Sequence, residues 1–598
     1  MIVYDFEIFK YDWLVCWLDT DTRKFHKIVN DRNKLRKFYE YYKNTIWIGY
    51  NSRNYDQWVC KAILCGFNPY EMSTWIIEKE QKGYAFSRLS NNYPINNYDC
   101  TVGFRSLKEL EAFMGHDIRE TTVPFDIDRK LTKEELEETI KYCMHDVKET
   151  FEVFCNTLEE FESHIGLIQE FRLGLKNISK TKAQLSAMIL GASKPAIDRN
   201  DEFCLDIPDT LRLGQYEWIR HWYEHWAKNV KDYSQMSLDA TINGVPHTFG
   251  IGGLHGAIKN YYGTGYYLMA DVGSYYPAMM IEYNWLSRNV KDPSKYRTIR
   301  DERLVMKAKK DPRQKPRKIV LNSTFGASKD KYNQLYDPRM ANNICVGGQL
   351  FLVDLLDKLD GKCDLIQSNT DGILLKLHRL EDKDKIIGIC NEWCKRTRME
   401  MEYDMYTKVI QRDVNNYILV DEKGNVKRKG AVVKKLSPLD NDLPIVNKAV
   451  VDYFVYGIPV ETTVMGSENL IDFQKITKVS GKYDFAFLEH SGGRMFKFEK
   501  TVVDKKSISG YKRAIEEKYG TKMNEKVHRC FATIEQNCGA LYKKHKGKTT
   551  LDKTAATPEH CRVINENVLD MPIPEWLDRG WYINLAKQKI SEFLGNKC

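Results

Sequence analysis

Tyr266-Tyr-Leu-Met-Ala-Asp-Val-Gly-Ser-Tyr-Tyr-Pro277 is the segment around which the rest of the chain can be arranged. Its apolar run predicts a buried strand that ends at Asp271. A tight turn through Gly273 and Ser274 follows, and Pro277 suits the first turn of a helix. The strand therefore presents one carboxylate at its end. This carboxylate serves either as a cap or turn residue, or as a metal ligand.

Length and composition are those of a large globular protein. The chain has 598 residues, more than one hydrophobic core can organise, so roughly three to five domains or subdomains are expected. No apolar run reaches the roughly 18 residues of a membrane span, and the first residues enter a strand pattern without a basic leader. The 15 cysteines are scattered without a Cys-x-x-Cys pair, which predicts reduced thiols. Together these features predict a cytoplasmic protein without a membrane partner.

Positive charge gathers after the opening segment. The net charge is +9, and Lys and Arg dominate residues 297–318. Arg303 and Lys307 share one face of a predicted helix, and Lys318, Asn322 and Phe325 share a face of a second helix expected to begin near residue 317. An antiparallel helix pair lined with cations would bind a polyanion, although a solvated charged hairpin fits the same pattern.

Three acidic sites lie within the first 150 residues. Asp5-Phe-Glu7 belongs to a strand pattern, so its two carboxylates share one face. Asp56 follows a short apolar run, and Tyr142 and Asp146 are one turn apart on a predicted helix. Several carboxylates are what a two-metal phosphodiesterase needs, but a solvent-facing strand edge explains Asp5 and Glu7 equally well.

These sites resemble, in order, the three motifs of DnaQ-like 3′–5′ exonucleases. The resemblance implies two Mg²⁺ ions, with Mn²⁺ as a substitute, and the 3′ end of single-stranded DNA as substrate. The implied metal ligands are Asp5, Glu7, Asp56 and Asp146, with Tyr142 as a further catalytic residue. Ser106-Leu107 resembles the element of that family that holds the primer terminus.

Two further segments carry candidate residues. Residues 364–376 form a hairpin pattern whose turn carries Asp371, and an Asp-Gly turn needs no catalytic explanation. Gly252-Gly253 lies in a glycine-rich segment that permits close backbone approach to a ligand. Through Gly252-Gly253 it resembles a segment that contacts template DNA in family B DNA polymerases.

The segments Asp271-x2-Ser274-Tyr275-Tyr276-Pro277, Lys318-x3-Asn322-Ser323-x-Phe325-Gly326 and Asn369-Thr370-Asp371-Gly372 resemble motifs A, B and C of family B DNA polymerases, of the compact phage type. They follow the exonuclease motifs in the order of that family. The resemblance implies a multidomain α/β and α+β fold: a DnaQ/RNase H-like exonuclease domain followed by a right-hand polymerase with an antiparallel palm sheet, helical fingers and a thumb. The expected ranges are 1–165 exonuclease, 166–260 connector and first part of the palm, 261–292 palm, 293–335 fingers, 336–432 palm, and 433–598 thumb and C-terminal region.

The resemblance also implies roles for individual residues. Asp271 and Asp371 would be catalytic and would hold two Mg²⁺ ions together with the backbone of Val272. The expected dNTP-binding residues are Ser274, Tyr275, Tyr276, Arg303, Lys307, Lys318, Asn322 and Phe325. The expected DNA contacts are Gly252, Gly253, Ser106, Leu107, Tyr417 and Lys429.

Several positions depart from the family pattern, among them Tyr275 where motif A usually has Leu and Gly250 where the template-contacting segment has Tyr. Asn369 replaces the first Asp of motif C, and Phe325 replaces a Tyr in motif B. The Lys-x-Tyr primer motif is matched only as Asn415-x-Tyr417, and the basic residues 427–430 are expected to supply the missing charge. In residues 433–598, helices are expected over residues 443–456 and 507–519, with basic patches such as 543–548.

The sequence thus predicts a DNA-directed DNA polymerase with 3′–5′ proofreading, a monomer that acts in DNA replication on primer–template DNA with dNTPs. An alternative is a 3′–5′ exonuclease whose polymerase half binds DNA but is inactive, which Asn369 favours. A third hypothesis is a zinc peptidase, because His221-Trp-Tyr-Glu-His225 matches an inverted zinc-binding motif; core packing of a helix explains that pattern as well.

Overall fold

The computed structural model describes residues 1–229, 236–490, 520–523, 525–547 and 551–595. These residues pack as two compact units. Unit 1 comprises the described residues within 1–162, 175–179 and 436–587, and unit 2 comprises those within 163–174, 180–435 and 588–595. The six consecutive domains expected from the sequence therefore do not coincide with the packing units, because residues 436–587 pack with the N-terminal part. The helix expected over residues 507–519 lies outside the described residues.

A five-stranded sheet forms the N-terminal part of unit 1, in the order β3-β2-β1-β4-β5. β1 is central, antiparallel to β2 and parallel to β4. Because β1 has a partner on both sides, the interpretation of Asp5 and Glu7 as residues of a strand edge is wrong. The strands are β1 (Ile2–Ile8), β2 (Trp13–Asp19), β3 (Lys24–Val29), β4 (Ile46–Gly49) and β5 (Asn96–Asp99).

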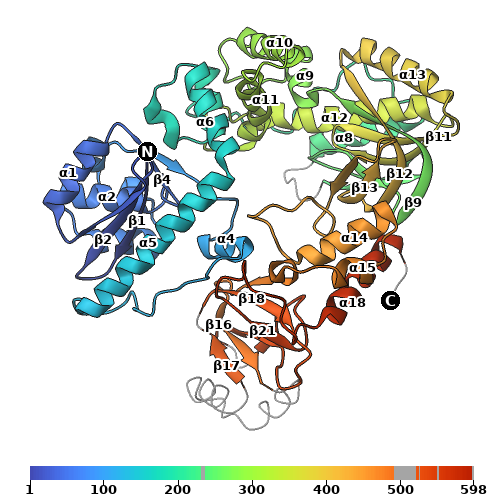
Figure 1. The fold of residues 1–598 in the computed structure, drawn as a ribbon. Coiled ribbons are helices and arrows are strands. Elements are labelled where there is room, and N and C mark those ends of the chain that lie inside the picture. The colour runs from blue at the N-terminus through green and yellow to red at the C-terminus, as the bar shows by residue number, and fades with distance from the viewer. Residues whose placement is uncertain (230–235, 491–519, 524, 548–550, 596–598) are drawn as a thin grey trace. The chain divides into compact units, whose positions relative to one another are not determined.

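Alternation along β1 sends its side chains to two helical layers. Tyr4 and Phe6 enter a hydrophobic core that includes side chains of α1 and α2. Asp5 lies on the opposite face, where α5 packs along β1 and β2 (Figure 1). α5 begins with a capping box between Thr132 and Glu135. The helices here are α1 (Arg32–Tyr42), α2 (Asp56–Cys65), α3 (Pro69–Ile77), α4 (Leu107–Met114), α5 (Lys133–Asn156) and α6 (Leu158–Glu170), the last of which runs on into unit 2.

The C-terminal part of unit 1 packs onto α4 through one buried cation. Arg529 lies on β18 with no exposed surface, and its guanidinium donates hydrogen bonds to the carbonyls of Ala112 and His116. The expected helix over residues 443–456 is confirmed as α14. The main elements are α14 (Pro444–Tyr456), α15 (Val460–Met465), β15 (Lys475–Lys478), β16 (Tyr483–Glu489), β17 (Gly520–Met523), β18 (Val527–Ala532), β19 (Leu541–His545), β20 (Leu551–Lys553), β21 (Cys561–Val563) and α18 (Arg579–Leu594), the last of which runs on into unit 2.

Unit 2 is built on a nine-stranded sheet in the order β14-β13-β12-β9-β11-β10-β8-β7-β6. β9, which carries the opening segment, is the fourth strand in this order and pairs antiparallel with both β11 and β12. The predicted hairpin is confirmed as β10 and β11 with Thr370 and Asp371 in the turn. The strands are β6 (Leu238–Ile242), β7 (Val245–Phe249), β8 (His255–Ala257), β9 (Tyr261–Val272), β10 (Asp364–Asn369), β11 (Gly372–Leu377), β12 (Met401–Asp413), β13 (Asn416–Val420) and β14 (Val426–Lys429).

Helices of unit 2 include the expected pair of basic helices, α10 and α11. α11 begins at Gln314, three residues before the expected start, and takes Pro316 into its first turn. A proline is tolerated there because first-turn N–H groups have no partner within the helix. The helices are α7 (Lys182–Ile189), α8 (Glu217–Asn229), α9 (Tyr275–Glu282), α10 (Ser294–Ala308), α11 (Gln314–Lys329), α12 (Pro338–Leu359) and α13 (Asp382–Thr397).

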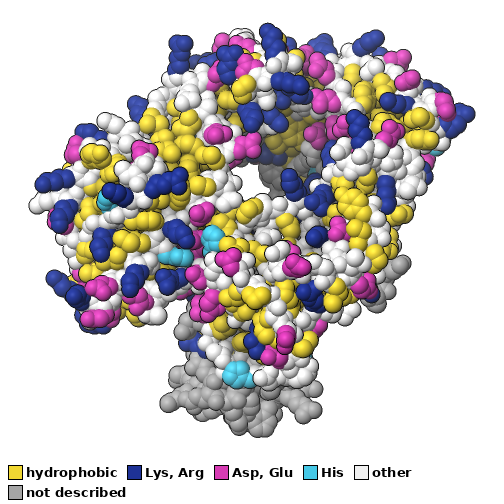
Figure 2. Space-filling model, in the orientation of Figure 1, with side chains coloured by type: hydrophobic (Ala, Val, Ile, Leu, Met, Phe, Trp, Pro, Cys, Tyr) yellow, Lys and Arg dark blue, Asp and Glu magenta, His cyan; other side chains and the backbone are white. Residues whose placement is uncertain are grey.

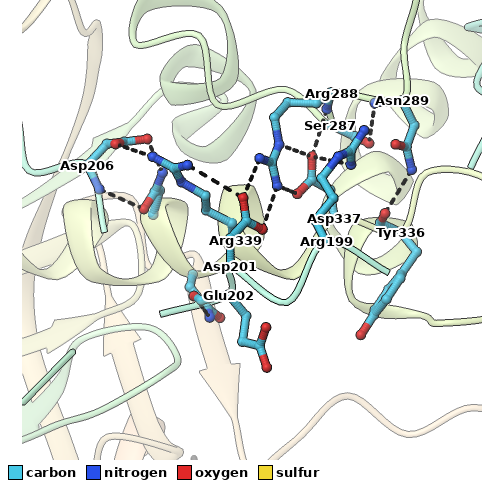
Figure 3. A network of polar contacts seen from close by, with 12 residues as sticks. Arg199, Asp201, Glu202, Asp206, Ser287, Arg288, Asn289, Tyr336, Asp337 and Arg339 are labelled. Atoms are coloured by element: carbon cyan, nitrogen blue, oxygen red, sulfur yellow. Dashed lines mark hydrogen bonds and ion pairs between the residues drawn. The ribbon is translucent and has the colours of Figure 1, made fainter. Parts of the chain in front are cut away.

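A polar network ties the loop residues 199–206 to the start of α12 (Figure 3). Asp337 is fully buried and accepts hydrogen bonds from the backbone N and the guanidinium of Arg288. The same guanidinium pairs with Asp201, and Arg339 pairs with Asp206. Each buried charge thus has an opposite partner, as a structural tie requires.

Surface charge of both signs is mixed. Figure 2 shows Lys and Arg side chains interspersed with Asp and Glu over the visible face. In the described part of the chain, none of the helices combines the length and apolar character needed to cross a membrane.

Candidate functional site

Unit 2 contains a pocket of about 770 Å³ where the ends of β9, β11 and β12 face α10 and α11. Among the residues that line it are Asp271, Val272, Ser274, Tyr275, Tyr276, Arg303, Lys307, Lys318, Asn322, Phe325, Asp371, Tyr417, Lys427 and Lys429. Polymerase-type residues predicted from five separate segments therefore meet in one cavity.

The two carboxylates predicted to be catalytic sit at adjacent strand ends. Asp271 near the end of β9 pairs in register with Gly372, and the N–H of Val272 donates to the carbonyl of Asp371 at 2.7 Å. A side chain at position 372 would collide with the Asp271 carboxylate, so the turn needs glycine there. Burial raises the pKa of both carboxyl groups, and the charge of Asp371 raises that of Asp271 further.

Lysines on β14 offset part of this negative charge. The ammonium of Lys427 lies 3.7 Å from Asp271 Oδ2. Lys427 and Lys429 both act to lower the pKa of Asp371, against the larger effect of its burial. The two lysines are two residues apart on one strand and so project from the same face. A cation held beside paired carboxylates indicates that the site attracts positive charge.

The opposite wall supplies cations from α10. Arg303 is only 7% exposed, and its Nη1 donates a hydrogen bond to Ser274 Oγ at 3.1 Å. Its Nε has no hydrogen-bond partner among the described residues. Lys307 pairs at 2.6 Å with Glu402, which lies directly opposite Asp271 on β12. This wall can therefore receive an anion with several oxygens.

Aromatic side chains close one side of the pocket. The Tyr276 and Phe325 rings lie 4.4 Å apart between centroids. Tyr275 is buried, and its hydroxyl donates to the carbonyl of Gly348 at 2.7 Å, so that hydroxyl is engaged in the core. Of the two neighbouring tyrosines, Tyr275 and Tyr276, it is Tyr276 whose ring contacts α11, through Phe325.

Among the predicted DNA contacts of unit 2, Gly252 and Gly253 lie outside the pocket lining, and the other two outside it, Ser106 and Leu107, belong to unit 1. Gly252 and Gly253 belong to the loop between β7 and β8, and the Gln349 side chain donates to the carbonyl of Gly252 at 3.0 Å. A side chain at position 253 would meet Thr370 in the turn that carries Asp371. The glycine therefore lets this loop support the hairpin turn.

Unit 1 gathers the carboxylates of the exonuclease-type motifs. Asp56, at the start of α2, accepts a hydrogen bond from the N–H of Phe6 at 3.1 Å. Burial raises the pKa of Asp56 to about 7 and that of Asp146 to about 6. The pKa values of Asp5 and Glu7 are also raised, by burial and by the neighbouring carboxylates. Several buried carboxyl groups that repel one another favour binding of a cation.

Within this cluster the ligand atoms fall into two groups. Asp5 and Glu7 lie with Cys143, and Asp146 lies with Glu111 and His145, each set within 4.8 Å. Asp146 is turned toward Lys108, whose ammonium donates to it at 2.6 Å. The structure thus brings the predicted residues near one another without placing Asp146 in the same ligand group as Asp5.

Lys108 and Cys143 belong to this cluster, although the three sequence motifs specify neither residue. Lys108 also lies 4.7 Å from the ring centroid of Tyr142. It follows Ser106 and Leu107, and Ser106 caps α4 in a capping box with Glu109. The sequence did contain one indication of Lys108. It directly follows the Ser106-Leu107 pair, and Glu111 lies one turn later on the same short helix.

The zinc-peptidase pattern does not form a metal site. His221, Glu224 and His225 are exposed on α8, whereas Tyr223 and Trp226 are buried. Among the described residues, the groups able to hold a metal ion do not include these three side chains. The pattern therefore reflects the two faces of an amphipathic helix.

Comparisons with known proteins add a similarity of fold. No family model matches the chain, and no curated protein matches its sequence. Among solved structures, the chain is similar to the family B DNA polymerase from the hyperthermophilic archaeon Pyrobaculum calidifontis, with 13% sequence identity and a TM-score of 0.43. That alignment covers 100% of this chain and 78% of the archaeal chain. At this level of similarity, function has to be argued from the side chains themselves.

Proposed function

We propose that the protein is a DNA-directed DNA polymerase of family B type with a 3′–5′ exonuclease activity. The observation that carries the proposal is the unit 2 pocket, where Asp271 and Asp371 at adjacent strand ends face Arg303 and Lys318 on two helices. Phosphoryl transfer needs chiefly positioned groups and neutralised charge, and this cavity offers both.

The residues of the pocket fit divalent cations. Its donors near the strand ends are carboxylate and backbone oxygens, which Mg²⁺ and Mn²⁺ prefer. Burial and mutual repulsion of Asp271 and Asp371 also favour a bound cation. When bound, two such ions would lower the pKa of the primer 3′-hydroxyl and stabilise the leaving pyrophosphate.

The chain's own groups would position the two substrates. Arg303, Lys307 and Lys318 would hold the triphosphate through charge-assisted hydrogen bonds. Tyr276 would lie against the sugar, where its ring excludes a 2′-hydroxyl, and Asn322 would line the nascent base pair. Lys427, beside Asp271, would meet the primer strand in place of the lysine missing from the Asn415-x-Tyr417 segment.

In unit 1, the carboxylates around β1 would serve strand shortening from a 3′ end. Asp5 and Glu7 would hold a divalent ion, and Asp56 and Asp146 would complete its surroundings. Ser106 and Leu107 would hold the terminal nucleotides. The fit rests on the raised pKa values of these buried carboxyl groups, which a cation would relieve.

The test is extension of a labelled primer–template by the purified protein in Mg²⁺, with and without the four dNTPs. Elongation with dNTPs and shortening without them are expected. No elongation at any dNTP or Mn²⁺ concentration would contradict the synthesis assignment.

One observation favours a second candidate, an exonuclease with a DNA-binding but inactive polymerase half. Asn369 lines the pocket where the family motif has an Asp, so one negative charge is missing. This candidate predicts shortening in both reactions, and zero elongation by an Asp5→Ala variant that no longer degrades the primer.

A further inference from the structure

A sulfur atom stands beside the two carboxylates of β1. Cys143 lies on α5, which packs along β1, and its thiol donates to Asp5 Oδ2 at 3.6 Å. The Cys143 Sγ and one carboxylate oxygen from each of Asp5 and Glu7 lie within 4.8 Å of one another. Glu7 and Cys143 are buried and Asp5 is partly buried. The three atoms could therefore close on one ion with small side-chain movements.

Glu7 provides an independent indication of a ligand. The residue is only 8% exposed, yet its carboxylate makes no hydrogen bond or ion pair with any described residue. The charge of Lys108 acts on Glu7 and lowers its pKa in part, but the ion pairs of Lys108 are with Asp146 and Glu111. A largely buried carboxylate whose remaining contact is with solvent is costly to keep charged, and a bound cation reduces that cost.

The donor set determines the kind of ion. Carboxylate oxygens alone suit Mg²⁺ and Mn²⁺, whereas a thiolate adds strong preference for Zn²⁺ and Cd²⁺. No cysteine is among the residues that line the pocket of unit 2, so its donors stay oxygen atoms. Both sites contain paired carboxylates, but only the site in unit 1 adds a sulfur ligand, so only that site should prefer soft, thiophilic metal ions.

We infer that Asp5, Glu7 and Cys143 form a mixed oxygen–sulfur site that binds a thiophilic divalent cation of the Zn²⁺ class. Binding replaces the S–H bond by a sulfur–metal bond, and the proton leaves to solvent without any change of oxidation state. The site itself does not depend on the proposed function. Its consequence for strand shortening does, since an ion held by sulfur would displace the ion that supports hydrolysis.

Cd²⁺ is the probe, because a cadmium–thiolate bond absorbs in the ultraviolet. Titration of the full-length protein is expected to give this absorption, with a component that disappears in Cys143→Ser. The variant should bind Cd²⁺ at this site about tenfold more weakly or worse, while its Mn²⁺ affinity, followed by electron paramagnetic resonance, changes by less than about twofold. Circular dichroism checks that the variant is folded.

Cys16→Ser is the matched control. Cys16 lies opposite Asp5 on β2 and is also buried, but it is outside the ligand group. This variant should keep the full absorption, which separates Cys143 from the other cysteines of the chain. If Cys143→Ser does not fold, Glu7→Gln provides the second test and should weaken Cd²⁺ binding about tenfold.

Equal Cd²⁺ titrations of the wild type and Cys143→Ser, or loss of the absorption in Cys16→Ser instead, would overturn the inference. The activity measurement separates it from the proposed function. Cd²⁺ should stop Mg²⁺-dependent shortening by the wild type and spare the Cys143→Ser variant. A protein that shows the cadmium–thiolate absorption but never shortens DNA would refute the nuclease and leave the metal site standing.

Discussion

At the scale of residues, the candidate sites depend on charges that the fold holds close together. Asp271 and Asp371 are 100 positions apart in the sequence, and the pairing of β9 with β11 makes them neighbours. The motif spacing predicted both residues. It could not predict Glu402 or Cys143, because each reaches its site from a neighbouring element through tertiary packing rather than through a local pattern. The basic residues 427–430 were expected to supply charge, but the approach of Lys427 to Asp271 was not. The roles of all these residues stay predictions.

Arg303 is expected to bind the triphosphate directly. Replacing it by Met in Arg303→Met keeps most of the buried volume and removes the guanidinium, so the KM for dNTP should rise about tenfold to 100-fold with a smaller change in kcat. Steady-state primer extension measures both constants. Arg297→Met is the control, because Arg297 is on the same helix but pairs with Glu282 and does not line the pocket. Equal effects of the two substitutions would contradict the assignment.

Because His247 is buried, we expect unit 2 to lose stability at acid pH. Its residue is 2% exposed, with Nδ1 2.8 Å from the carbonyl of Val245 and Nε2 2.6 Å from Ser368 Oγ. Burial lowers the pKa of His247 to about 4, below its value of about 6.5 in the unfolded chain. Neutral His247 therefore makes its full contribution to the free energy of unfolding above pH 6.5. As the pH falls toward 4, about 3 kcal/mol of that free energy is lost.

Urea unfolding at pH 7.0, 5.5 and 4.5, followed by a probe in unit 2, measures this loss. A His247→Gln variant should be less stable at pH 7.0 but should lose less of its remaining stability on acidification. An unchanged pH dependence in this variant would show that other groups control the acid transition.

At the scale of elements, hydrophobic period and turn chemistry predicted much of the local structure. The β10–β11 hairpin, the pair α10 and α11, and α14 were all expected from the sequence. The start of α11 was placed too late because Pro316 was interpreted as a helix boundary, whereas a first-turn position has no hydrogen bond to lose. The packing of the described residues of 436–587 with α4 was not predictable, since the buried Arg529 bonds backbone carbonyls that carry no sequence signature.

The tie between residues 199–206 and α12 predicts a large effect of one substitution. Asp337→Asn removes the fully buried charged partner of the Arg288 guanidinium, which is 31% exposed and keeps its pair with Asp201, so the free energy of unfolding should fall by about 2–3 kcal/mol. Chemical denaturation measures it. Asp206→Asn is the control, since the Asp206 side chain is 46% exposed and its pair with Arg339 should contribute at most about 1 kcal/mol. A similar small loss in both variants would contradict the structural role of the network.

At the scale of the whole molecule, each packing unit contains its own cluster of carboxylates. The acidic cluster around Asp5 lies in unit 1 and the pocket around Asp371 lies in unit 2. The order of motifs along the sequence predicted two separate chemistries. It did not predict that the chain would return to unit 1 after residue 435, because that depends on long-range packing rather than on motif order.

Separation of the two activities by single substitutions tests the central claim most directly. Asp5→Ala and Asp371→Ala should each stay folded, and both would be assayed on one labelled primer–template in Mg²⁺ with and without dNTPs. Asp5→Ala should lose shortening by at least about 100-fold and keep elongation, and Asp371→Ala should do the reverse, because each carboxylate serves one site only. Loss of both activities in either folded variant would contradict the assignment of two independent sites.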